Sequence, residues 1–190
     1  MSAMVEMPIE PDLAVQFRRG EDSAFDKIVE RHSAEVAALA NGLLGWPGEV
    51  DDVVQEVFLS AFLGLRRFRG QCLLRTWLFA ITVNKCRSWR LRRRRAFSAR
   101  VIIDPDDLSG LDRSSDRAAM DAETFARVRR AVQALPQKYR EVVVLKYLQG
   151  LETQEACELL GLTVNAMQVR LNRARARLKE QLGDLFEEKP

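Results

Sequence analysis

The segment from Asn165 to Arg177 repeats amide and guanidinium side chains at helical spacing. At about 100° per residue, the middle of one face holds small and polar residues: Asn165, Val169, Asn172, Arg173 and Ala176. The two edges of that face are polar or basic: Gln168 and Arg175 on one side, Arg170 and Arg177 on the other. Amides and arginines hydrogen-bond to base edges, an exposed valine contacts a thymine methyl group, and edge arginines meet phosphates. The pattern predicts a helix that lies in a DNA major groove, with Asn172 and Arg173 as the main base readers.

The residues before this helix have the spacing of a helix-turn-helix. A short helix begins near Thr153, Gly161 supplies a turn, and Thr163 caps the second helix. The opposite stripe of the second helix is apolar and must pack on the preceding helices: Met167, Leu171, Ala174 and Leu178. A basic amphipathic helix with a solvated face is the alternative, but cap, turn and exposed valine in this order favour DNA binding.

A second basic cluster follows a glycine-broken loop. A helix predicted from about Thr76 carries Trp77 and Trp89 and then runs into arginines that no acid interrupts: Arg90, Arg92, Arg93, Arg94 and Arg95. Aromatic rings beside basic side chains suit single-stranded DNA, whose bases unstack and whose phosphates need neutralising. For the two tryptophans themselves, core packing is the preferred interpretation.

An acidic helix face lies in the same half of the chain. Asp51, Asp52, Gln55 and Glu56 gather on the outer face of a helix whose inner face is apolar. An ordinary solvated surface, or acids favoured by the helix dipole, would be the simplest explanation. Because a DNA-binding module has little reason to present both this face and the arginine tract to DNA, we expect the acidic face to meet a basic protein.

Composition and periodicity predict an all-α protein of two small domains. The 190 residues are 47% hydrophobic and 30% charged, and a net charge of +3 conceals strong local segregation. Helical periodicity recurs throughout, without sustained strand alternation. We expect one helical domain over residues 10–100, a flexible acidic linker over residues 101–121, and a helix-turn-helix domain over residues 122–186.

Several functional classes find no support in the sequence. Cys72, Cys86, Cys157 and the single histidine, His32, show no metal-binding spacing or disulfide framework, so we expect three mostly buried thiols in a reducing cytoplasm and no metal or cofactor. A phosphate-binding glycine loop is missing, and His32 has no evident catalytic companions. The acidic N-terminus and the lack of a long apolar run predict a cytoplasmic protein without direct membrane insertion.

Three blocks together resemble the extracytoplasmic-function sigma factors of the sigma-70 family: DDVVQEVFLSAF, FRGQCLLRTWLFAITVNKCRSWRLRRR, and LPQKYREVVVLKYLQGLETQEACELLGLTVNAMQVRLNRARARL. The resemblance spans residues 24–182. It implies that the first block docks on the clamp helices of the β′ subunit of core RNA polymerase, with further contacts to β. The implied docking residues are Asp51, Asp52, Gln55, Glu56 and Phe58.

The resemblance also assigns the DNA contacts. The loop over residues 68–75 would capture a flipped base of the minus-ten element, with Asn84 beneath it, and extruding that base costs a few kcal/mol. The implied minus-ten residues are Phe68, Arg69, Gln71, Leu74, Arg75, Trp77, Asn84, Arg87, Arg90 and Arg93. The minus-thirty-five residues would be Asn165, Gln168, Val169, Arg170, Asn172, Arg173, Arg175 and Arg177. Gln71, Leu74 and Val169 depart from the family pattern, so no promoter consensus is carried over.

The function expected from these observations is promoter recognition and melting without catalysis. Two linked, individually weak binding events would give the overall affinity, so the protein alone should bind duplex DNA weakly. An anti-sigma factor and association with the nucleoid are further implications of the resemblance. The alternative is a stand-alone helix-turn-helix repressor or activator that dimerises on a palindrome, a role in which the acidic face has no clear task.

Overall fold

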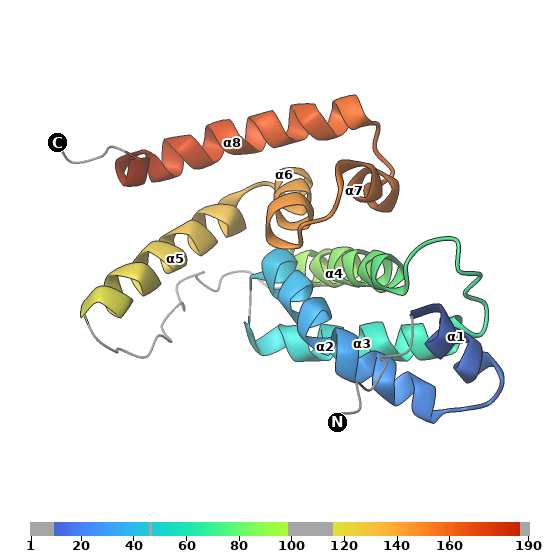
Figure 1. Cartoon of the computed structure of the whole chain (residues 1–190). Helices are drawn as coiled ribbons and strands as arrows, with labels where there is room; N and C mark the ends of the chain where they lie inside the picture. Colours follow the sequence, from blue (N-terminus) through green and yellow to red (C-terminus); the bar gives the residue numbers. More distant parts are fainter. Residues whose placement is uncertain (1–9, 46, 99–115, 187–190) are drawn as a thin grey trace, which may run out of the picture.

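The structure, a computed structural model, describes residues 10–45, 47–98 and 116–186, and every element in these ranges is a helix (Figure 1). The first half contains four helices: α1 (Glu10–Arg18), α2 (Ser23–Leu44), α3 (Pro47–Leu65) and α4 (Leu74–Ser98). The second half contains α5 (Asp116–Ala134), α6 (Gln137–Val143), a π-helical turn η1 (Val144–Leu148), α7 (Thr153–Leu160) and α8 (Val164–Phe186). The predicted all-α class is confirmed.

The first domain is a bundle in which α2, α3 and α4 all pack against one another and α1 covers α2. The apolar stripe of α2 is buried, with Ile28, Val36 and Leu39 all 1% exposed or less, because their spacing places them on one helix face. The α2 helix ends at Gly45, whose positive φ of 78° lets its N–H bond the carbonyl of Asn41 at 2.9 Å.

In the second domain, α6 lies across α8, and α5 and α7 pack against the same long helix. Figure 1 shows α6 and α7 between α8 and the first domain. Val142, Val143 and Val144 from the α6 and η1 segment are buried with Met167 of α8. The helix-turn-helix is therefore held from one side only, and the opposite face of α8 points away from the rest of the molecule.

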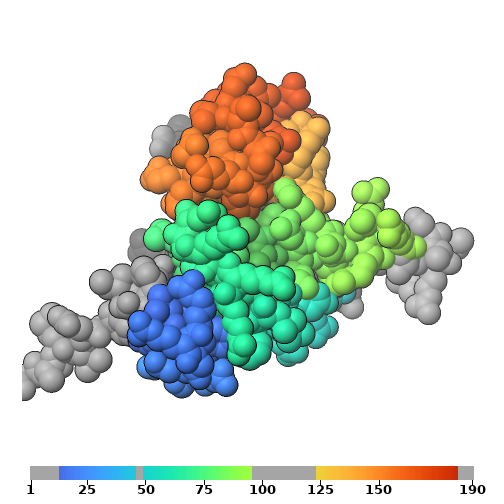
Figure 2. All heavy atoms as spheres, turned by 90° about the vertical axis from the view of Figure 1, so that its right-hand side faces the viewer, coloured from blue at the N-terminus to red at the C-terminus, as the bar shows by residue number. Residues whose placement is uncertain are grey.

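The two domains also pack directly against each other. The α2 helix contacts η1, α5 and α6, and α4 contacts α7, so that the second domain rests on α4 and the loop before it (Figure 2). Buried side chains of both domains belong to one continuous hydrophobic core. The sequence predicted two domains but gave no indication of this contact.

The predicted linker has a different C-terminal boundary in the structure. Residues 101–115 lie outside the described residues, but residues 116–121 already form the first turns of α5. The expectation that the linker reaches residue 121 is therefore wrong at this end. Alanine and methionine have high helix propensity, and the run Ala118, Ala119, Met120 continues directly into the helix.

Candidate DNA-binding and docking surfaces

The helix-turn-helix is built by local capping interactions. The backbone N–H of Glu152 donates to a carboxylate oxygen of Glu155 at 3.2 Å at the start of α7. Gly161 takes a left-handed conformation with φ of 65° and ends that helix. The Thr163 hydroxyl then accepts a hydrogen bond from the N–H of Ala166 at 3.2 Å at the start of α8. The predicted helix, turn and cap are confirmed.

The two faces of α8 divide as the helical spacing predicts. Met167 and Ala174 are fully buried and Leu171 is 3% exposed. The opposite stripe is exposed along its length: Asn165, Val169, Asn172, Arg173 and Ala176. Gln168, Arg175 and Arg177 on its edges are also exposed, whereas Arg170 is half-buried. The structure thus brings the predicted minus-thirty-five residues together on one open helix face.

One tyrosine lies at each edge of this face. The Arg175 guanidinium donates to the Tyr147 hydroxyl and lies 5.5 Å from the centre of that ring, and Arg177 lies 5.6 Å from the ring of Tyr139. A hydrogen bond from Arg173 lowers the pKa of Tyr139. Only the three-dimensional position of the two tyrosines beside α8 reveals their contact with the arginines.

The acidic face of α3 lies at the surface, but part of it is already neutralised. Asp51, Asp52 and Gln55 are exposed. Glu56 accepts a hydrogen bond from Arg92 at 3.0 Å and lies 3.6 Å from the Lys85 ammonium. A neighbouring pair joins Glu49 to Arg93 at 3.0 Å. The acidic face and the arginine tract of α4 therefore balance each other's charge within one domain.

Phe58 was expected on the docking surface, but its side chain is only 8% exposed. Its ring lies 6.5 Å from the ring of Phe25 in the domain core, because it shares the inner face of α3 with the buried valines. The exposed apolar residues of α3 are instead Leu59 at 62%, Phe62 at 41% and Leu63 at 70%. Sequence reasoning missed these three, although the segment has more apolar residues than one helix face can bury.

The loop before α4 presents fewer of the predicted minus-ten side chains than expected. Arg69 and Gln71 are exposed, but Phe68 is 9% exposed, with its ring 5.1 Å from that of the half-buried Trp77. Leu74 was predicted to face a base, yet it is 2% exposed. The physical reason is that α4 begins at Leu74, so this side chain joins the buried stripe of the helix rather than the loop.

The polar and basic side chains along α4 differ in their surroundings. Asn84 is exposed, and Arg93 lies 5.3 Å from the centre of the Trp89 ring. Arg75, in contrast, donates to Glu35 at 3.1 Å and to the backbone carbonyl of Gln149 at 3.0 Å. The structure therefore places some of the predicted minus-ten residues at the surface and others against the second domain.

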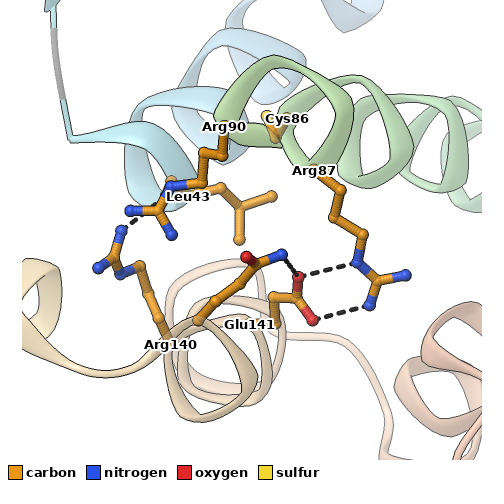
Figure 3. A pocket seen from close by; sticks show the side chains of 7 residues that line it. Leu43, Cys86, Arg87, Arg90, Arg140 and Glu141 are labelled. Atoms are coloured by element: carbon orange, nitrogen blue, oxygen red, sulfur yellow. Dashed lines mark hydrogen bonds and ion pairs between the residues drawn. The ribbon is translucent and has the colours of Figure 1, made fainter. Parts of the chain in front are cut away.

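A small cavity marks this contact between the domains (Figure 3). Seven residues line it: Leu43, Cys86, Arg87, Arg90, Gln137, Arg140 and Glu141. Arg87 bonds Glu141 through two nitrogens, at 2.9 and 2.7 Å. Burial would raise the pKa of Glu141, but hydrogen bonds from Arg87 and Gln137 lower it below its ordinary value.

Burial also shifts the pKa values of Arg90, Arg140 and Cys86, which line the same cavity. It lowers the pKa of Arg90, and it lowers that of Arg140 to about 10, because a desolvated guanidinium favours its neutral form. Burial favours the neutral form of the Cys86 thiol too, and so raises its pKa to about 12. The cavity thus gathers three guanidinium groups around a single carboxylate.

Known families match both halves of the chain. Residues 28–96 match the family described as sigma-70 region 2, and residues 125–178 match sigma-70, region 4. The RNA polymerase sigma factor CnrH of Cupriavidus metallidurans is 35% identical over 178 residues, which cover 90% of this chain and 92% of that protein. The chain belongs to the extracytoplasmic-function sigma factors.

Other similar proteins support this family membership. The extracytoplasmic-function sigma factor SigM of Mycobacterium tuberculosis is 34% identical, with 87% of this chain and 81% of the relative covered. The solved structure of CnrH in complex with the cytosolic domain of CnrY superposes with a TM-score of 0.68 at 31% identity, covering 92% of this sigma factor and 97% of CnrH. The expectation of an RNA polymerase sigma factor is confirmed, and the alternative of a stand-alone repressor finds no support.

Two further observations concern what the described ranges contain. Across residues 10–45, 47–98 and 116–186, no helix combines the length and apolar character needed to cross a bilayer. The same part of this sigma factor holds no cluster of three or more histidine, cysteine or acidic side chains placed to bind a metal ion.

Proposed function

We propose that this sigma factor reads the minus-thirty-five element with the exposed face of α8. The observation that carries this proposal is the division of that helix into a buried apolar stripe and an exposed stripe of small, polar and basic residues, which includes Asn172 and Arg173. A major groove admits one helix and offers acceptors to arginine and paired sites to amides. The edge residues Arg175 and Arg177, steadied by tyrosines, would contact phosphates on the groove walls.

The first domain would dock on core polymerase and open the minus-ten region. Asp51, Asp52 and Gln55 present a polar, acidic surface, and the adjoining exposed Leu59 and Leu63 add apolar area. Such a combination suits the clamp helices of the β′ subunit, with further contacts to β. The exposed Gln71 and Asn84, with the arginines of α4, would hold the unpaired strand.

The remaining roles follow from the family. We expect a non-catalytic initiation factor that works in the cytoplasm at the nucleoid and needs no cofactor. CnrH was solved in complex with the cytosolic domain of CnrY, and the sigma factor RpoE of Bartonella quintana in complex with the anti-sigma factor NepR. An anti-sigma partner is therefore proposed for this chain as well.

The test is run-off transcription with core RNA polymerase on a promoter library. The double variant Asp52→Arg, Glu56→Arg reverses the charge of the docking face, so we expect its promoter-dependent transcripts to fall at least tenfold. A matched control, Asp26→Arg with Glu30→Arg, makes the same change of charge at the same spacing on the exposed side of α2. Equal loss in both variants would contradict the docking face, and the absence of transcripts from the unaltered protein would contradict the proposed function.

A further inference from the structure

The cavity between α4 and α6 holds more positive than negative charge. The seven described residues that line it include three arginines and one acid. Arg87 and Glu141 form a two-pronged pair at 2.9 and 2.7 Å, so their charges neutralise each other. The Cys86 thiol adds no negative charge, because burial raises its pKa to about 12. The positive charges of Arg90 and Arg140 remain to be balanced.

Two helix ends balance the charge of Arg140. Its guanidinium donates to the carbonyl of Leu43 in the last turn of α2 at 3.0 Å, and to that of Leu135 directly after α5 at 2.9 Å. Each helix C-terminus carries about half a negative charge. The Nε–H of the same side chain, in contrast, is buried and has no hydrogen-bond partner in the part of the chain that the structure describes. A buried donor of this kind calls for an acceptor.

The charge of Arg90 has no such compensation. Its half-buried side chain forms no hydrogen bond or ion pair within the described residues. Figure 3 shows its guanidinium beside that of Arg140, on the side of the cavity away from the Arg87 to Glu141 pair. Burial, and then the charge of Arg90, lower the pKa of Arg140 to about 10. Two like charges are thus held together with one positive charge in excess.

The cavity is small, and its walls are fixed by close packing beside it. Its volume is about 10 Å³, which is close to what one water-sized ligand occupies. Next to the lining residue Leu43, a Cβ atom built at Gly42 would lie 2.9 Å from a methyl group of the fully buried Val144. Because α2 and η1 are in such close contact, the cavity cannot adjust to a much larger ligand.

We propose that this cavity binds one monatomic inorganic anion, chloride, between the guanidinium groups of Arg90 and Arg140. The anion would accept the buried Nε–H of Arg140 and the free donors of Arg90, and its single charge matches the single excess charge. A phosphate or a carboxylate has several atoms and exceeds the volume. Because the two arginines come from different domains, the site is complete only while α4 and α6 are packed together, so anion binding stabilises that packing. The proposed reading of DNA assigns no ligand to this cavity.

The first experiment is thermal unfolding of the full chain, with chloride replacing gluconate at constant ionic strength. For a Kd of about 10 mM, 300 mM chloride should raise the Tm by about 4–8 °C relative to gluconate alone. Arg90→Gln should lose at least half of this chloride-dependent shift. The matched control Arg94→Gln removes the same charge one turn further along α4, at an exposed position outside the cavity, and should keep the shift. An equal response to chloride in the unaltered protein and Arg90→Gln would overturn the proposal.

The second experiment places the anion directly and needs no variant, so it does not depend on the folding of Arg90→Gln. Crystals of the unaltered protein grown in sodium bromide should show an anomalous peak between the guanidinium groups of Arg90 and Arg140. Bromide peaks at the surface alone would mean an adventitious ion only, and a water molecule without anomalous signal in the cavity would equally refute the site. Neither result bears on promoter recognition, which run-off transcription tests separately.

Discussion

Arg173 and Arg175 are two residues apart on α8 but should affect promoter binding in different ways. Arg173 lies in the middle of the exposed stripe, where its guanidinium can reach base edges, whereas Arg175 lies at the edge beside Tyr147. An arginine that pairs with a guanine contributes about 1–3 kcal/mol of discrimination. Arg173→Ala should therefore weaken binding about 5- to 150-fold on promoters with the preferred base at one position, and little on the others.

Arg175→Ala should instead weaken binding on every promoter and change its dependence on salt. Each phosphate contact contributes about 0.9 to the slope of log affinity against log salt. Between 50 and 200 mM KCl, the variant should therefore lose about 3.5-fold less affinity than the unaltered protein. Fluorescence anisotropy of the holoenzyme on labelled promoters, mutated singly through the minus-thirty-five element, measures both quantities. Our assignment would be refuted if Arg173→Ala weakened all templates alike, or if Arg175→Ala acted at a single base pair.

Three further measurements test the packing and the interdomain contact. Leu171→Ala should lower the free energy of unfolding in urea by about 2–5 kcal/mol, since it empties a buried site under the recognition helix; a change under 1 kcal/mol would contradict that packing. Glu141 has a lowered pKa, so it contributes stability above its unfolded value of about 4.3, and this is lost as the pH falls through the folded pKa. The destabilisation by Glu141→Gln should thus be larger at pH 7 than at pH 3, and equal values would contradict the pairing. A maleimide at pH 7 should label Cys72 rapidly and the two buried thiols only after denaturation; rapid labelling of all three would contradict their burial.

Local features of the fold could be predicted from the sequence because they depend on neighbours in the chain. The helix-turn-helix required only the spacing of Met167, Leu171 and Ala174, the turn at Gly161 and the cap at Thr163. All five lie within 14 residues, so the periodicity of one helix and two local signals were sufficient.

The sequence predicted side-chain burial wrongly where a helix boundary or a contact with a distant residue decides whether the side chain is buried. Leu74 was placed in a loop, but starting α4 at that residue turns its side chain into the core. On α5, Phe125 and Val128 share helical spacing with the buried Val132 and Leu135, yet they are 71% and 37% exposed. Helical periodicity shows which residues share a face but not how much of that face a neighbour covers.

The contact between the domains could not be predicted by any local pattern. Arg87 and Glu141 are 54 positions apart, and each alone resembles an ordinary surface charge. The glycine at position 42 lies inside α2, where a glycine ordinarily weakens a helix. Its role becomes visible only when Val144 is placed against it.

The shared use of Arg87 also limits how this protein can change during evolution. If Arg87 holds DNA as proposed, a substitution there that alters this contact also alters the pair with Glu141, so DNA binding and the packing of the two domains cannot be adjusted separately at that position. Val169, in contrast, is exposed on α8, on the stripe opposite the buried Met167 and Leu171. If α8 reads bases as proposed, new promoter preferences would arise at Val169 without disturbing the contact between the domains, which makes it the position to randomise when this sigma factor is engineered for an orthogonal promoter.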